Sequence, residues 1–101
     1  MKVYICGKVT GEDPLFCSMK FKQHAYHLRE LGHEVINPME LVPVGVDWKL
    51  AMIICIRELI TCDAISPLAD TLNSKGAMLE WSIAQQLGLH IIMPLYETIK
   101  K

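Results

Sequence analysis

Short apolar runs alternate with longer stretches of helical periodicity along the chain. Four such runs contain β-branched residues and are bounded by glycine or proline, at 3–6, 33–36, 62–68 and 89–93. Runs of this length and composition are typical of buried strands. We therefore predict four strands, the third of which is contained within 62–68.

Three longer stretches have apolar residues at helical spacing, and they span 15–31, 48–60 and 74–87. Asp47 can cap the second stretch, and Gly32 and Gly88 supply the stops of the first and third. The remaining internal segments, which are rich in glycine, proline and polar residues, are predicted loops.

The alternation of strands and helices predicts an α/β fold with an all-parallel sheet. Right-handed crossovers place helices on both faces of such a sheet, in three layers. We expect the strand order 2-1-3-4. Ligands of these sheets bind beyond the carboxyl ends of the strands, where the order reverses, which here is between the first and third strands. The loops at that edge are 7–13, 37–46 and 66–75.

The composition narrows the class of protein. The 101 residues predict a single domain, 1–101, of which 51% is hydrophobic and 21% charged, with a net charge of −1. Because no basic stripe is present, a nucleic-acid polymer is not an expected partner. No run approaches the length of a membrane span, and the N-terminus enters a strand pattern directly. We expect a cytoplasmic protein without a membrane partner.

The second helical stretch is apolar almost all round, although one face of a sheet covers only a stripe of a helix. The excess predicts a second subunit, and we expect a homodimer or a higher homo-oligomer. The four cysteines form no C-x-x-C pair and are interpreted as reduced core residues (Cys6, Cys17, Cys55 and Cys62). We predict neither a metal site nor a cofactor.

Glu80 lies on the wrong side of its predicted helix. At about 100° per residue it falls in register with Ala77, Ala84 and Leu87, on the apolar side. Burying an unpaired carboxylate is costly, but Glu80 is in the second turn, close to the edge of the sheet where ligands bind. There the helix dipole and nearby donors can hold it ionised while partial desolvation keeps it reactive. The alternative is a side chain that bends to the rim or caps a backbone amide.

Residues near Glu80 support a functional interpretation. Ser74 and Gly76 open the same helix, where a cap hydroxyl, exposed N–H groups and close backbone approach suit an anion such as phosphate. Ser74 as a simple cap is compatible with this role. Gly7 follows the first strand as a glycine of close approach, and Tyr4 lies within that strand.

Several of these residues belong to a recognisable pattern. The segments Tyr4-Ile5-Cys6-Gly7 and Cys62-Asp63-Ala64-Ile65, with the spacing Ser74-x-Gly76-x-x-x-Glu80-x-x-x-Ala84-x-x-x-Gly88, resemble the nucleoside 2-deoxyribosyltransferase superfamily. Segments 2–11, 32–38 and 62–63 are similar to an uncharacterised group of short bacterial and phage proteins classed with it. The resemblance covers nearly the whole chain.

The resemblance implies a flavodoxin-like, Rossmann-like fold and cleavage or transfer at the N-glycosidic bond of a 2-deoxynucleoside or its 5′-monophosphate. It implies Glu80 as the nucleophile that forms a covalent deoxyribosyl intermediate. Asp63 would assist the leaving base or orient the site, and Tyr4 would lie near the sugar. Substrate binding is assigned to five residues, namely Gly7, Lys8, Ser74, Gly76 and Trp81. Serine at 74, rather than aspartate, favours a 5′-phosphorylated ligand.

The chain departs from the family pattern after the nucleophile, where Trp81 and Ser82 replace the usual apolar residue and glycine. The bulky Trp81 would narrow the pocket or stack on a base. Three functions therefore stay open. The first is an N-deoxyribosyltransferase or 2-deoxynucleotide N-glycosidase, the second a non-catalytic nucleotide-binding module for sensing or assembly, and the third a purely structural accessory subunit.

Overall fold

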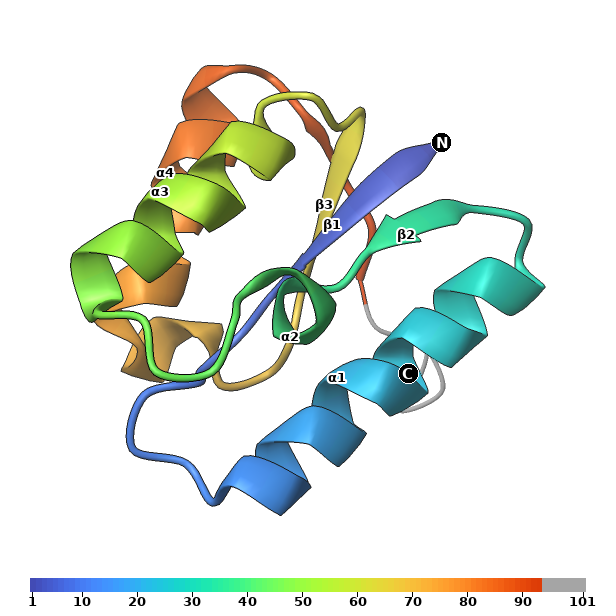
Figure 1. Cartoon of the computed structure of the whole chain (residues 1–101). Helices are drawn as coiled ribbons and strands as arrows, with labels where there is room; N and C mark the ends of the chain where they lie inside the picture. Colours follow the sequence, from blue (N-terminus) through green and yellow to red (C-terminus); the bar gives the residue numbers. More distant parts are fainter. Residues whose placement is uncertain (94–101) are drawn as a thin grey trace.

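The computed structural model describes residues 1–93 and contains a four-stranded, all-parallel sheet (Figure 1). The strand order is β2-β1-β3-β4, which confirms the predicted order. Pairing is in register along β1, where Val3 lies opposite Val35 on one side and Ala64 on the other. The strands are β1 (Lys2–Cys6), β2 (Glu34–Ile36), β3 (Ala64–Pro67) and β4 (His90–Ile91).

The three predicted helices are present within one residue of their expected ends, as α1 (Pro14–Glu30), α3 (Trp48–Leu59) and α4 (Lys75–Gln86). Their beginnings follow from capping. The side chains of Asp13, Asp47 and Ser74 each accept a hydrogen bond from a backbone N–H in the first turn of the helix that follows. Gly32 and Gly88 follow α1 and α4 with positive φ angles of 91° and 73°, which glycine adopts without strain.

Two segments predicted as loops contain short helices, α2 (Pro38–Leu41) and the 3-10 helix η1 (Thr71–Asn73). Asn37 begins α2, because its side chain accepts a hydrogen bond from the Met39 amide and Pro38 occupies the first helical position. Single turns are too short to produce a periodicity, so the hydrophobic pattern could not predict them.

Helices cover both faces of the sheet, as predicted. Side chains alternate along β1, so Val3 and Ile5 pack against α1 while Tyr4 and Cys6 pack on the face covered by α3 and α4. Figure 1 shows α1 on one side of the strands and the α3/α4 pair on the other. Each face has its own core, and the largest side chain buried in either is Tyr4.

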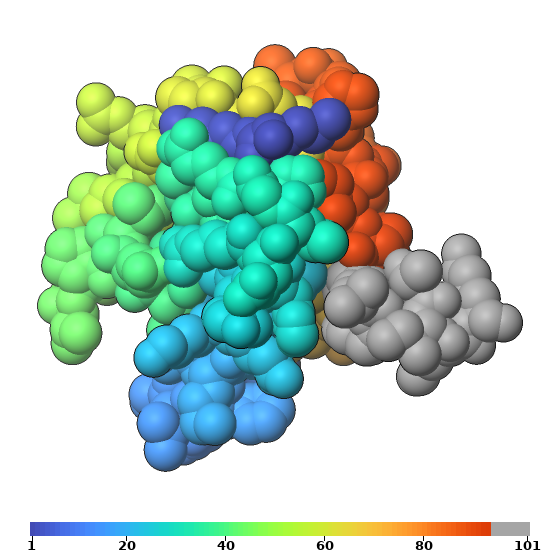
Figure 2. All heavy atoms as spheres, turned by 90° about the vertical axis from the view of Figure 1, so that its right-hand side faces the viewer, coloured from blue at the N-terminus to red at the C-terminus, as the bar shows by residue number. Residues whose placement is uncertain are grey.

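Apolar side chains remain exposed on the outer surfaces of the helices. On α3 they include Leu50 and Ile53, and on α1 they include Leu15 and Met19. Figure 2 shows that α1, in light blue to cyan, lies on the surface of the face seen there. The expected homodimer stays a prediction. None of the helices within residues 1–93 is long and apolar enough to cross a membrane.

The cysteines are not paired with one another. All four cysteines are free and buried. Within residues 1–93, no three His, Cys, Asp or Glu side chains are grouped so that they could hold a metal ion.

Candidate functional site

A pocket of about 310 Å³ lies at the carboxyl edge of the sheet, mostly on the α3/α4 face, and Phe21 of α1 also contributes to its wall. This volume is at the small end of the range for ligand-binding sites. Four segments form most of its wall: the loop after β1, α2 with the residues that follow it, the first half of α3, and the first turns of α4. The lining residues are Gly7, Val9, Thr10, Phe21, Pro38, Met39, Val42, Pro43, Val44, Trp48, Ala51, Met52, Cys55, Ser74, Gly76, Ala77 and Glu80.

Glu80 is part of this wall although its side chain belongs to the core. The residue is 5% exposed, and the Tyr4 hydroxyl donates a hydrogen bond of 2.6 Å to its Oε2 atom. Among the residues that the structure describes, Oε1 has no hydrogen-bond partner, and no fully buried side-chain oxygen is left unpaired. Oε1 is therefore the oxygen that a ligand in the pocket can reach.

Burial controls the ionisation of this pair. Desolvation raises the pKa of Glu80 to about 7, although the hydrogen bond from Tyr4 acts to lower it. Desolvation, followed by the nearby Glu80 charge, raises the pKa of Tyr4, so the phenol stays protonated and remains a donor. The Cys55 thiol in the same wall stays protonated too, because burial raises its pKa to about 11. Near neutral pH, only the carboxyl group of this cluster changes its charge.

Gly7, Ser74 and Gly76 line the pocket, and their environments explain their residue types. A Cβ at Gly7 would lie 2.7 Å from Leu68 Cδ1, so a larger residue would push against the Leu68 side chain. A Cβ at Gly76 would lie 3.0 Å from Met52 Sδ, so glycine at this position allows α4 to pack closely against the Met52 side chain of α3. The Ser74 hydroxyl accepts from the Ala77 amide and can still donate its own proton.

Three of the residues assigned to the site are not among the pocket-lining residues. Asp63 precedes β3 and is therefore at the amino edge of the sheet, where it is exposed and accepts a hydrogen bond of 2.9 Å from the Lys2 amide. Trp81 is not one of the pocket-lining residues and packs against the α3/α4 core. Lys8 contributes its backbone to a neighbouring polar cluster and is not one of the pocket-lining residues. The structure thus brings together Tyr4, Gly7, Ser74, Gly76 and Glu80.

Sequence reasoning missed the α3 side of the pocket. Trp48, Met52 and Cys55 recur at spacings of four and three residues, which place one helical face against the cavity. The same spacing is typical of core packing, and only the position of Trp48 at the start of the helix, at the ligand-binding edge, distinguishes it. Lys75 lies over the Trp48 ring, with its ammonium nitrogen 4.9 Å from the ring centre, and brings a positive charge close to the pocket.

Comparison with known families assigns this chain to one of them. The family model described as a domain of unknown function, DUF4406, matches residues 1–93. The chain belongs to the DUF4406 family. The match includes all of the pocket-lining residues, so the site of this DUF4406 chain lies within the family's domain. No curated protein matches the chain. Because the family description gives no activity, the similarity to nucleoside 2-deoxyribosyltransferases stays a prediction.

Proposed function

We propose that this DUF4406 protein cleaves the N-glycosidic bond of a 2-deoxynucleoside or its 5′-monophosphate through Glu80. The supporting observation is that Glu80 is almost fully buried, accepts a hydrogen bond from Tyr4 through one oxygen, and lines a pocket while its other oxygen has no hydrogen-bond partner among the described residues. In the proposed first step, Oε1 attacks the anomeric carbon of the sugar as the bond to the base breaks. The base leaves with the bonding electrons and takes a proton from water.

The product of this step is a deoxyribosyl ester of Glu80. In the second step, water or a second base attacks the same carbon and releases the carboxylate, so the sugar is either hydrolysed or transferred. The Tyr4 hydroxyl holds the carboxyl group in one orientation through both steps. The nucleophile must be ionised, so activity should rise with pH through about 7, the pKa of Glu80.

The lining of the pocket also suggests where the base and the 5′-phosphate of the ligand bind. The apolar wall formed by Trp48, Met52 and Val42 suits the flat face of a base. The start of α4, with the Ser74 hydroxyl and the Gly76 amide, suits a 5′-phosphate when the ligand carries one. Asp63 has no role in this proposal, because it lies at the opposite edge of the sheet.

The test is incubation of the purified chain with a panel of 2′-deoxynucleosides and their monophosphates, followed by chromatography of the released base. We expect at least one substrate to release base with the wild type. Glu80→Gln should abolish this release, whereas Glu30→Gln, at an exposed glutamate of α1, should not change it. Release that is absent from every wild-type reaction, or undiminished in Glu80→Gln, would overturn the proposal.

One observation favours a second candidate, a non-catalytic nucleotide-binding module. Glycoside cleavage commonly employs two carboxyl groups, one as nucleophile and one as acid. Among the pocket-lining residues within 1–93, only Glu80 carries a carboxyl group. Thermal stabilisation of the wild type by a nucleotide, with no base released from that nucleotide, would select this candidate.

A further inference from the structure

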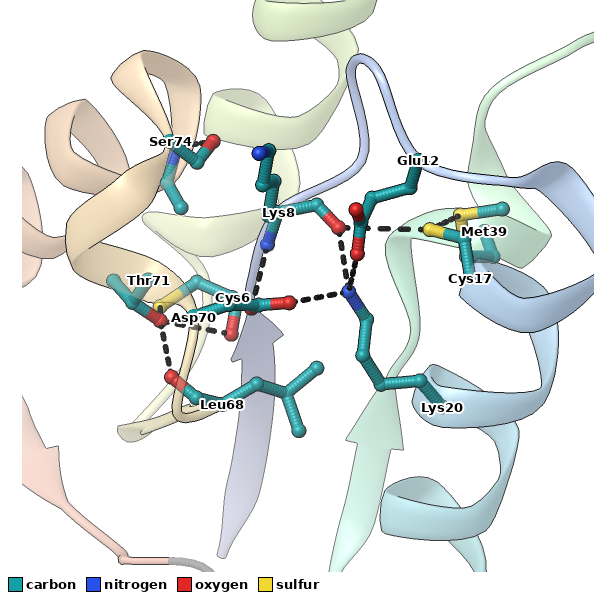
Figure 3. Close-up of polar contacts among 11 residues, drawn as sticks. Cys6, Lys8, Glu12, Cys17, Lys20, Met39, Leu68, Asp70, Thr71 and Ser74 are labelled. Atoms are coloured by element: carbon teal, nitrogen blue, oxygen red, sulfur yellow. Dashed lines mark hydrogen bonds and ion pairs between the residues drawn. The ribbon is translucent and has the colours of Figure 1, made fainter.

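Outside the pocket, a largely buried lysine joins three segments of the chain at the same edge of the sheet. The Lys20 side chain, on α1, is 15% exposed. Its ammonium nitrogen donates to Asp70 Oδ2 at 2.5 Å, to the Lys8 carbonyl oxygen at 2.8 Å and to Glu12 Oε1 at 3.0 Å. Figure 3 shows these contacts converging on the nitrogen. Because an ammonium group has three protons, these three acceptors satisfy it fully.

Asp70 completes a clamp on the backbone of Lys8. Its Oδ1 atom accepts a hydrogen bond of 2.9 Å from the Lys8 amide, while its Oδ2 atom holds Lys20. Lys20 in turn holds the Lys8 carbonyl group. Both backbone polar groups of one loop residue are therefore bound by a single ion pair between α1 and the segment that leads into η1.

The two segments joined by this clamp lead into separate parts of the pocket wall. Gly7, Val9 and Thr10, on either side of Lys8, line the pocket from the β1–α1 loop. Asp70 lies four residues before Ser74, which begins α4 and lines the pocket from that side. The Lys20–Asp70 contact thus connects two of the segments that line the cavity.

The cluster is built to stay charged. Burial acts to lower the pKa of Lys20, but the hydrogen bonds with Asp70 and Glu12 outweigh it and the pKa is raised. Removing one member of a shielded charge network leaves its partners without compensation, so the geometry of the network is strongly specified.

We propose that Lys20 and Asp70 are positioning residues that fix the spacing between the β1–α1 loop and the start of α4, and thereby set the affinity of the pocket for its substrate. The kinetic consequence rests on the proposed function, whereas the fixed loop geometry does not. Neither side chain lines the pocket, so both act through the backbone of Lys8.

Hydrogen exchange tests the geometric part directly. In Lys20→Met the amide of Lys8 should exchange about tenfold faster, because its acceptor Asp70 loses the charge that holds it in place. Lys22→Met is the matched control, since Lys22 is exposed on the same helix and takes no part in the cluster. Equal exchange at the Lys8 amide in the two variants would overturn the proposal.

Two further variants keep the test decisive if Lys20→Met fails to fold. Asp70→Asn retains an oxygen for the Lys8 amide but loses the charge that holds Lys20, so it should accelerate exchange at the same amide. Glu12→Gln removes the charge of one of three acceptors and should have a smaller effect. Because the clamp acts as a unit, the Lys8 amide of Lys20→Met/Asp70→Asn should exchange no faster than that of the more affected single variant. Effects of the two substitutions that multiply would overturn the proposal.

Kinetics test the positioning role. With the substrate that the wild type cleaves, Asp70→Asn should raise KM at least about fivefold and leave kcat within about twofold, since the Tyr4–Glu80 pair is untouched. An unchanged KM in a variant whose loop exchanges faster would overturn the positioning role. Absence of base release from the wild type contradicts the proposed function instead, and the exchange measurement still decides whether the clamp exists.

Discussion

On each face of the sheet, an ionisable side chain is buried beside a hydroxyl group. On the α3/α4 face the pair is Glu80 with Tyr4, and on the α1 face it is His24 with Ser66, where His24 Nε2 lies 2.7 Å from Ser66 Oγ. Burial favours the neutral form in both, because it raises the pKa of Glu80 to about 7 and lowers that of His24 to about 4. The two pairs differ in their access to the pocket.

The hydroxyl group of the His24–Ser66 pair is already fully bonded within the protein. Ser66 donates its proton to the Ile92 carbonyl oxygen at 2.5 Å, so His24 must donate through Nε2 and cannot act as the base of the serine. Neither residue lines the pocket. The Glu80 pair leaves one carboxyl oxygen free on a pocket wall. A displaced pKa is therefore common to a structural pair and a candidate catalytic pair, and access to a cavity distinguishes them.

The largest expected difference between the pairs is in activity. Glu80→Gln should lower base release at least about a thousandfold, because no other carboxyl group lines the described pocket. His24→Gln should retain the wild-type rate per folded molecule. The rates are compared by chromatography of the free base, after circular dichroism has established the folded fraction. Loss of activity in both variants to the same extent would remove the distinction.

The second difference is in the pH dependence of stability. The folded-state pKa of Glu80 is raised from 4.5, so its contribution to the free energy of unfolding falls as pH rises from about 4.5 to about 7. The folded-state pKa of His24 is lowered from 6.5, so its contribution falls as pH drops from about 6.5 to about 4. Each effect is about 3 kcal/mol across its window.

The contributions of Glu80 and His24 to the free energy of unfolding change in opposite directions with pH in the wild type. Single substitutions should separate the two contributions. Glu80→Gln should become more stable relative to the wild type as pH rises toward 7. His24→Gln should become more stable relative to the wild type as pH falls toward 4. Urea unfolding at several pH values measures both. A constant difference between either variant and the wild type across its window would contradict the assigned ionisation.

The third difference is in stability at a fixed pH. Ser66→Ala should cost about 2 kcal/mol at pH 7, because it leaves the His24 ring and the Ile92 carbonyl group buried without their partner. Denaturant unfolding gives this value, and base release should be unchanged. A loss of activity in the folded Ser66→Ala protein would place the α1 face in the mechanism and contradict the comparison.

The smallest expected effect comes from Tyr4→Phe. Loss of its hydrogen bond should raise the pKa of Glu80 further, since that bond acts to lower it. The midpoint of the pH–activity profile should move to higher pH, and kcat/KM at pH 7 should fall roughly tenfold. A profile with the wild-type midpoint would show that Tyr4 does not control the ionisation of Glu80.

The sequence predicts the frame of this molecule well and its long-range contacts poorly. The strand order and the helix ends follow from local signals such as Asp47, Gly32 and the apolar runs, and Glu80 is conspicuous because it breaks the periodicity of its own helix. The contact between Tyr4 and Glu80 joins residues 76 positions apart, and no local pattern contains it.

The misplaced residues have physical explanations. Asp63 comes just before a strand, and in a parallel sheet the residue before a strand lies at the amino edge, away from the ligand-binding edge. Trp81 follows Glu80 by about 100° around the helix, so the two side chains leave the helix in different directions, and only Glu80 lines the pocket. The Lys20–Asp70 contact spans 50 positions, and Lys20 is one of several charged residues on an amphipathic helix. The sequence alone therefore does not predict that these two residues pair.

The central claim is that Glu80 titrates near neutral pH within reach of a ligand, and carboxyl carbon-13 NMR tests it most directly. With glutamate labelled, and Glu80→Gln used to assign the signal, the account predicts a midpoint near 7 that shifts when a 2′-deoxynucleoside or its monophosphate is added. A midpoint near 4.5, or a signal that no member of the nucleoside panel perturbs, would contradict it.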